Sequence, residues 1–229
     1  MHDNQGNDEQ KQSSNDRADE DNRREDTQRR GWFAPIVLVL LVLSLIGNVY
    51  LYSDKLQQGK ADREEAGLRI MQDAQTFHNA VLTMIDRLDS FAQADSIEGR
   101  MLALQDLGAA AESGTAGLKG LLAAADGHGG RVPLTMDDKV SAYSFMAMVN
   151  ENLFHIGSHA GQLNEEDASF VAMLQASLTE IEAIAAQFDF PAEPTEMMAL
   201  QTAGGGAWID IVYELVAAIG QVELRSLQG

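Results

Sequence analysis

Cysteine is absent from this chain. The protein therefore cannot form a disulfide, and it cannot be anchored as a lipoprotein, because that attachment needs a cysteine thiol. Asn-x-Ser/Thr sites for N-glycosylation are absent as well. Secreted eukaryotic domains commonly use both features, so their joint absence favours a protein of the bacterial envelope.

Positive charge is scarce: 16 Lys and Arg residues stand against 35 Asp and Glu residues, and the formal net charge is −19. The first thirty residues hold six basic and nine acidic side chains, whereas residues 53–229 hold ten and twenty-six. Binding to nucleic acid needs clustered Lys and Arg over the phosphates, so nucleic acid is excluded as a partner. The acidic region should also be repelled by anionic lipid headgroups.

Charge of either sign is missing from residues 31–53, which read GWFAPIVLVLLVLSLIGNVYLYS. About twenty apolar residues are enough for a helix to cross the hydrocarbon core of a bilayer. Trp32 lies at one end of the run and Tyr50 and Tyr52 at the other, where aromatic rings favour the headgroup level. The alternative to a membrane span is that residues 31–53 form a helix buried in a protein core. The run is too long for a cleaved signal peptide and has no small-residue cleavage site, so we predict a permanent transmembrane anchor that contacts the lipid bilayer.

The basic residues beside this run indicate its orientation. Five arginines lie in residues 16–30 and four basic residues in 53–69, but Arg29 and Arg30 are almost adjacent to Trp32. Basic residues next to a span tend to stay in the cytoplasm, whereas long domains cross largely regardless of charge. We predict a cell-membrane protein with one span, a cytoplasmic N-terminus and an extracytoplasmic C-terminal domain.

Residues 1–30 contain no aromatic residue and, beyond Met1 and Ala18, no apolar one. Such a segment cannot bury enough apolar surface to offset the entropy of ordering. We predict a disordered, charged cytoplasmic tail that is too short to be a folded signalling module.

After the span, the apolar residues follow a helical period and no strand pattern occurs. The sequence predicts an all-α fold, in which a single transmembrane helix precedes an up-down bundle of four to five helices. The bundle covers residues 54–188, a Pro/Gly linker with a short turn covers 189–206, and an amphipathic helix covers 207–229. The span is expected to continue into the first bundle helix, with Gly59 and Gly67 as weak points.

Local signals set the expected starts of the helices. Ser96 and Asn164 are typical N-caps, Thr135 is followed three residues later by Asp138, and a short turn begins at Thr195. Because Gly costs about 1 kcal/mol relative to Ala in a helix, the helix that begins after Ser96 is expected to break near Gly114.

The inward faces follow from spacings of three and four residues. The first bundle helix is expected to bury Met71, Ala74, His78, Val81, Ile85, Leu88 and Ala92, and the second Ile97, Met101, Leu104, Gly108, Ala111, Thr115, Leu118, Leu122 and Ala125. The third is expected to bury Val140, Tyr143, Ala147, Asn150, Phe154 and Gly157, flanked by Met146 and Leu153, and the fourth Val171, Leu174, Leu178, Ile181, Ala185 and Phe188.

The C-terminal helix, expected from Trp208 to about Leu227, carries Trp208, Ile211, Leu215 and Ile219 on one face. Four preceding helices are enough to close a bundle. This face therefore either packs as a fifth helix or binds a protein partner, and a homo-oligomer also stays open. In both cases a large apolar stripe has to be covered.

Residues that carry chemistry are few. Glu151, His155 and His159 share a helix face by their spacing of four, which could hold a metal, but no His-Glu-x-x-His motif is present. His78 lies on a seam and is expected to be a hydrogen-bonded core histidine. The glycine clusters match no nucleotide-binding motif. We assign no catalytic, cofactor-binding or metal residue and no cofactor, and we predict that the protein is not an enzyme.

Together these observations predict a membrane-anchored scaffold or partner-binding module of the cell envelope. The layout resembles the helical ectodomains of single-anchor spore-envelope proteins, although no motif is shared, and sporulation would suit it. One alternative is a ligand-sensing ectodomain, resembling the four-helix sensors of bacterial receptors, that works with a separate signalling partner. A metal-dependent hydrolase is a second alternative that rests only on Glu151, His155 and His159.

Overall fold

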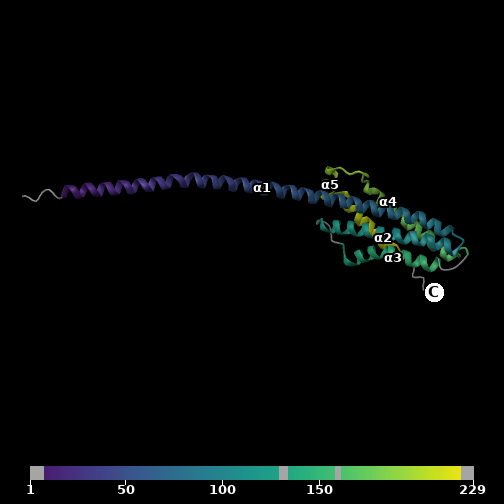
Figure 1. Cartoon of the computed structure of the whole chain (residues 1–229). Coiled ribbons are helices and arrows are strands. Elements are labelled where there is room, and N and C mark those ends of the chain that lie inside the picture. Colours follow the sequence, from purple (N-terminus) through teal and green to yellow (C-terminus); the bar gives the residue numbers. More distant parts are fainter. Residues whose placement is uncertain (1–7, 129–133, 158–160, 223–229) are drawn as a thin grey trace, which may run out of the picture. The chain divides into compact units, whose positions relative to one another are not determined.

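The computed structural model describes residues 8–128, 134–157 and 161–222 (Figure 1). All regular structure in these ranges is helical, as predicted. The helices are α1 (Asp8–Gln93), α2 (Ile97–Gly127), α3 (Met136–Gly157), α4 (Glu165–Ala185), the 3-10 helix η1 (Ala186–Phe188), α5 (Glu196–Ala203) and α6 (Ala207–Gln221). The chain divides into two compact units, Met1–Gly59 and Lys60–Gly229. We call the described part of the second unit the helical domain.

The first unit contains the long apolar part of α1. Every residue from 33 to 59 is exposed, including all the large apolar side chains. A helix that is apolar on all sides and uncovered is suited to lipid. This stretch is therefore compatible with a membrane anchor, as predicted. Helix α1 also includes residues 8–30, and the predicted disorder of the tail stays a prediction; residues 1–7 lie outside the described ranges.

Other helices also meet the length and composition of a span. Glu165–Phe188 does so alone, and Glu196–Ala203 does so together with Ala207–Gln221, although that pair is bent by 59°. A third of the apolar window in Glu165–Phe188 is buried within the structure, whereas none of the N-terminal window is. Burial of these apolar faces among neighbouring helices gives them an environment other than lipid.

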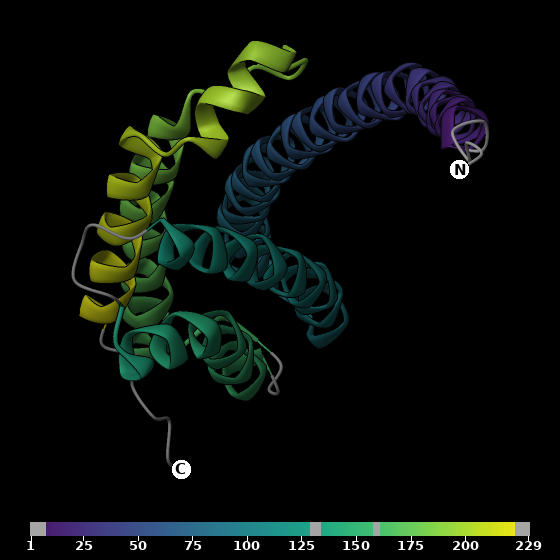
Figure 2. The same ribbon diagram turned by 90° about the vertical axis from the view of Figure 1, so that its left-hand side faces the viewer.

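The helical domain has one hydrophobic core to which α1, α2, α3, α4 and α6 all contribute. Figure 2 shows α6 alongside α4. The predicted inward face of α4, from Val171 to Phe188, is buried as expected. The apolar face of α6 is buried as well, and Trp208 is only 5% exposed. Helix α6 therefore packs within its own domain; its predicted extension to Leu227 falls on residues 223–229, outside the described ranges.

Helix starts follow the local sequence signals. Ser96 Oγ and Asn164 Oδ1 accept the main-chain N–H three residues further on, at 3.1 and 2.8 Å. Thr135 Oγ1 accepts the N–H of Asp138 at 3.1 Å, while Asp138 Oδ2 accepts the N–H of Thr135 at 3.0 Å. The pKa of Asp138 lies below its usual range, because its carboxylate also accepts the Thr135 hydroxyl at 2.7 Å in addition to the Thr135 N–H, and the ionised form is the better acceptor; the hydroxyl bond is the larger cause.

The predicted break near Gly114 is wrong, because α2 is continuous from Ile97 to Gly127. The glycines instead allow close packing. A Cβ atom on Gly117 would lie 2.6 Å from the carbonyl oxygen of Asp73 and 2.9 Å from the main-chain nitrogen of Phe77, both on α1. Gly67 faces Ala199 of α5 in the same way, and α1 runs through it without a break. The gain from helix packing outweighs the low helix propensity of glycine.

The predicted central line of the inward face of α3 is also wrong, whereas Met146 and Leu153, which were predicted to flank it, are buried. Val140 and Phe154 are each 54% exposed, and Ala147 is exposed too. The buried face consists of Ala142, Phe145, Met146, Val149, Leu153 and Ile156. Both stripes have helical spacing, but the predicted one includes Tyr143 and Asn150, and the core takes the more apolar stripe. Similarly, Ile97 and Met101 at the start of α2 are exposed rather than buried.

Candidate docking groove

Two of these misassigned residues, Met101 of α2 and Phe154 of α3, help to line a groove of about 410 Å³. Its lining residues come from the first turns of α2 and the last turns of α3, and they are Glu98, Met101, Leu102, Leu104, Gln105, Asn150 and Phe154. We call this set the α2–α3 groove. Leu102 is 61% exposed, Phe154 54% and Met101 41%. Large apolar side chains that gather in one hollow on a soluble surface are typical of an interaction site.

The groove is acidic at its edge. Glu98 lines it, and Glu151, next to Asn150, is exposed. Among the described residues that line it, none is lysine or arginine. The surrounding region is acidic throughout, with ten basic and twenty-six acidic residues in 53–229. An apolar floor with an acidic edge favours an apolar ligand that carries positive charge.

A second groove, of about 530 Å³, is polar in character. It lies between α1 and α2 and is lined by Thr76, Asn79, Ala80, Thr83, Arg87, Asp106, Ala109, Ala110 and Ser113. Nε of Arg87 lies 3.3 Å from Oδ2 of Asp106 without the geometry of a hydrogen bond. Thr83 already donates its hydroxyl to the carbonyl of Asn79. This groove could admit a small polar ligand that bonds to the Arg87–Asp106 pair.

The predicted metal candidates do not form a described cluster. Glu151 and His155 are both exposed on α3, and His159 lies outside the described residues. Among the described residues, no group of three or more His, Cys, Asp or Glu side chains is close enough to hold a metal. The ring of His155 instead packs edge-on against Phe154, with centroids 6.4 Å apart.

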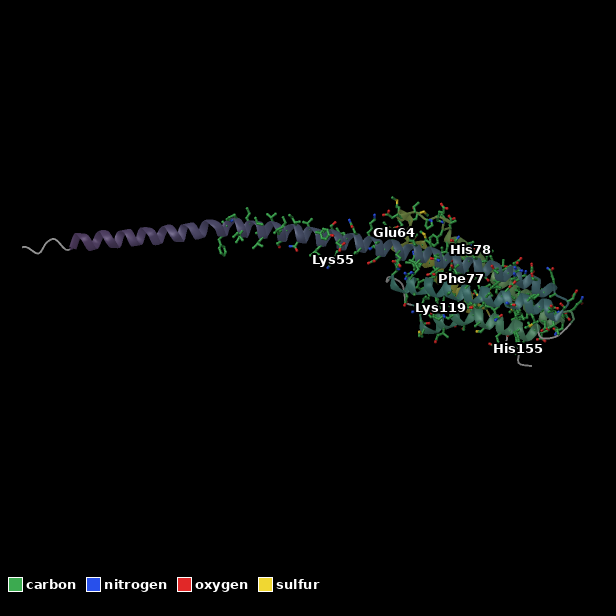
Figure 3. The ribbon with its side chains drawn as sticks, in the orientation of Figure 1. Lys55, Glu64, Phe77, His78, Lys119 and His155 are labelled. Carbon is green, nitrogen blue, oxygen red and sulfur yellow. The ribbon has the colours of Figure 1, made fainter. Side chains whose placement is uncertain are left out.

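His78 is hydrogen-bonded, as predicted. Its Nε2 atom lies 3.1 Å from Oε1 of Glu182, which joins α1 to α4 at a half-buried position. Figure 3 shows His78 on α1 and His155 on α3, so the two rings belong to different helices. The contact explains a polar residue on an apolar seam and assigns it a structural role.

Two polar residues that join distant segments were not predicted from the sequence, the buried Arg100 and the half-buried His128. Arg100 is fully buried, and its guanidinium donates to the carbonyls of Ala94, at 3.1 Å through Nε, and Gly161. It therefore joins the α1–α2 turn to the segment before α4. Arg100 stands four residues before Leu104 on the buried face of α2, and this spacing was the only sequence signal of its burial.

The second missed residue is His128, which follows the end of α2. Its Nδ1 lies 2.8 Å from the carbonyl oxygen of Ala124, and its Nε2 lies 2.9 Å from that of Ala203, at the end of α5. The ring also packs edge-on against Trp208, with centroids 5.3 Å apart. Since both neighbours are acceptors, both contacts are hydrogen bonds only when both ring nitrogens carry hydrogen.

Asp73 is a carboxyl group whose pKa is raised by its surroundings. It packs on α2, where its carboxylate occupies the space that a Cβ on Gly120 would take. Burial raises the pKa of Asp73, and the charge of Arg69 offsets part of this rise. The carboxylate is thus destabilised at neutral pH, although it does not adjoin either groove.

These features define an all-helical protein with a long apolar N-terminal helix and an acidic helical domain that bears an uncovered apolar groove. Comparison with known protein families, with curated proteins and with solved structures found no match.

Proposed function

We propose that the protein is a single-pass anchor that presents its helical domain outside the cytoplasm, where the domain serves as a scaffold or partner-binding module of the bacterial envelope. In this proposal residues 31–53 span the membrane, and the helices of the domain follow one another up and down. The role is not enzymatic. The observation that carries the proposal is the α2–α3 groove, because exposed Leu102, Phe154 and Met101 need a cover.

The groove is a better candidate for a partner than the C-terminal helix. The apolar face of α6 is already buried in the domain core. A partner bound there would first have to displace α6, which would expose Trp208 and Leu215. A partner bound to the α2–α3 groove would displace only water.

Two measurements in cells test this proposal. A protease added to protoplasts should digest the helical domain and spare the N-terminal tail, and protection of the domain would reverse the orientation. A photocrosslinking amino acid at Leu102 should give a discrete crosslinked protein. The same amino acid at Leu82, which is exposed on α1 outside both groove linings, is the control. Equal crosslinking patterns at the two sites would contradict a partner at the groove.

The alternative of a ligand-sensing ectodomain is favoured by the polar groove between α1 and α2. A ligand there would contact both helices and bond to Arg87 or Asp106, so it would raise the melting temperature by mass action. A panel of small polar compounds, tested for thermal stabilisation of the full chain and of its Arg87→Ala variant, checks this role. Stabilisation that survives in Arg87→Ala would place the ligand elsewhere.

A further inference from the structure

We propose that the α2–α3 groove binds a basic, amphipathic helix of a partner protein. This inference rests on the partner-binding function proposed above and names the chemistry of the partner. Three properties of the groove carry it: its position between two helices, its apolar floor and its acidic edge.

The shape and spacing of the groove suit a helix. The exposed apolar residues that line it come from both helices, with Met101 and Leu102 in the first turns of α2 and Phe154 in the last turns of α3. A hollow between two helices accepts the apolar face of a third, whose side chains at i, i+3, i+4 and i+7 fit between the rows. The described residues contain no strand with which an extended peptide could pair. A helix is therefore the secondary structure of the ligand that fits this surface.

The methionines and the leucine at the surface favour a helical ligand further. Met101 lines the groove, and Met148 of α3 is also exposed, though it is not part of the lining. Methionine is unbranched and polarisable, so it adapts its shape to an incoming side chain. Leu102 is the most exposed apolar residue of the groove and would lose the most solvent contact on binding.

Charge decides between the possible occupants. Glu98 lines the groove, the described residues of the lining include no lysine or arginine, and residues 53–229 hold sixteen more acidic than basic residues. A second copy of the chain would bring two such surfaces together, which like-charge repulsion disfavours. An anionic lipid surface is disfavoured for the same reason. A helix with Lys or Arg along the borders of its apolar face would instead pair with Glu98 and be attracted by the acidic domain.

The chain's own amphipathic helix is not available to fill the groove. Trp208, Leu215 and Ile219 of α6 are buried in the core of the same domain. The occupant therefore comes from another chain.

Binding of two synthetic helical peptides to the full-length protein tests the proposal. Both peptides carry the same leucine face; one has lysine and the other glutamate at every flanking position. The protein is held in nanodiscs of zwitterionic lipid, empty nanodiscs give the background, and fluorescence anisotropy reports binding. The lysine peptide should bind saturably and at least tenfold more tightly than the glutamate peptide. The difference should shrink at 0.5 M salt, because salt screens exposed charges.

Variants locate the site. Leu102→Ser should weaken binding of the lysine peptide at least fivefold, because it removes a large apolar contact from the centre of the groove. Glu98→Gln should weaken binding and reduce its salt dependence. Leu82→Ser, on the exposed surface of α1, is the matched control and should bind like the unaltered protein. Leu102 and Leu82 are both exposed, so neither serine should prevent folding.

Three results would overturn the proposal. These are equal binding of the two peptides, unchanged binding to Leu102→Ser, and self-association of the protein that Leu102→Ser abolishes while the lysine peptide does not bind. The photocrosslink at Leu102 in cells separates this inference from the proposed function. A discrete crosslinked partner together with failed peptide binding refutes only the basic-helix chemistry, whereas the loss of both refutes the groove as a partner site.

Discussion

Replacement of Gly117 by alanine should destabilise the domain, although the same change usually stabilises a helix. In an open helix interior, Gly to Ala gains about 1 kcal/mol. Here the new methyl group would lie 2.6 Å from the carbonyl oxygen of Asp73 and 2.9 Å from the main-chain nitrogen of Phe77. Main-chain atoms of a helix cannot rotate away, so α1 and α2 have to separate.

The size of the effect follows from that separation. Opening a packed interface by 0.5–1 Å forfeits roughly a quarter to a half of each dispersion contact, and overpacked sites typically lose about 1–3 kcal/mol. Residues Phe77 and Leu118, both fully buried, lie on the two helices at this contact. A clash with main-chain atoms belongs at the upper end of that range, about 2–3 kcal/mol, so after the gain of about 1 kcal/mol in helix propensity is subtracted we expect a net loss of about 1–2 kcal/mol. That corresponds to a fall in melting temperature of about 3–6 °C for a domain of this size.

Thermal unfolding of the full-length protein in detergent, followed by circular dichroism at 222 nm, measures this change. Gly220→Ala is the matched control, because a Cβ there meets no atom within 4 Å, and its melting temperature should stay the same or rise. If Gly117→Ala melts as high as Gly220→Ala, the helices are not in the close contact on which this reasoning depends.

Three further substitutions test Arg100, which is buried, and His128 and Asp73, which are half-buried. Arg100→Met should cost about 2–4 kcal/mol in chemical unfolding, since the carbonyls of Ala94 and Gly161 lose their donor; a loss below about 1 kcal/mol would contradict this role. His128→Phe keeps a ring beside Trp208 but removes the ring nitrogens that contact the carbonyls of Ala124 and Ala203. Tryptophan fluorescence in a Trp32→Phe background should therefore shift as α5 loosens. An unchanged spectrum would count against the contact between His128 and Ala203. Asp73→Asn should melt higher than the unaltered protein at pH 7. Burial raises the folded pKa of Asp73 above 3.8, so the contribution of Asp73 to stability is complete below that value and is lost as the pH rises through the folded pKa. The difference in melting temperature between Asp73→Asn and the unaltered protein should therefore shrink toward pH 4. A difference that stays constant with pH would refute the assignment.

What the sequence predicted well depends on neighbours along the chain. A cap such as Asn164 needs only the amide three residues later, and Thr135 with Asp138 completes its own box. The inward face of α4 was predictable because one stripe of that helix is far more apolar than the rest. The apolar run in residues 31–53 was visible for the same reason.

The errors arose where two local signals competed or where a partner was distant in sequence. Helix α3 has two stripes of helical spacing, and only packing against the other helices selects the one with Phe145 and Leu153. Gly117 predicts a weak helix locally, whereas its role depends on α1, about forty residues earlier. The candidate groove could not be predicted, because Met101 and Phe154 were assigned to the core and the other exposed residues of its lining stood outside every predicted seam. Arg100 and His128 acquire their roles only through carbonyls on other segments.

Helix α5 shows how such distant contacts substitute for local stability. An isolated helix of fewer than about twelve residues is marginal in water, and α5 has eight. Four contacts along its length hold it: Glu196 forms an ion pair with Lys60, Ala199 packs against Gly67, the carbonyl of Thr202 accepts from Nε1 of Trp208 at 3.0 Å, and the carbonyl of Ala203 lies 2.9 Å from Nε2 of His128. The Lys60 pair is exposed and contributes little, so the other three contacts have to supply most of the stability. Gly205 and Gly206, which follow directly, adopt positive φ angles that turn the chain into α6. The contact with His128 therefore fixes both the end of α5 and the entry to α6, which explains why a single histidine ring lies against both Ala203 and Trp208.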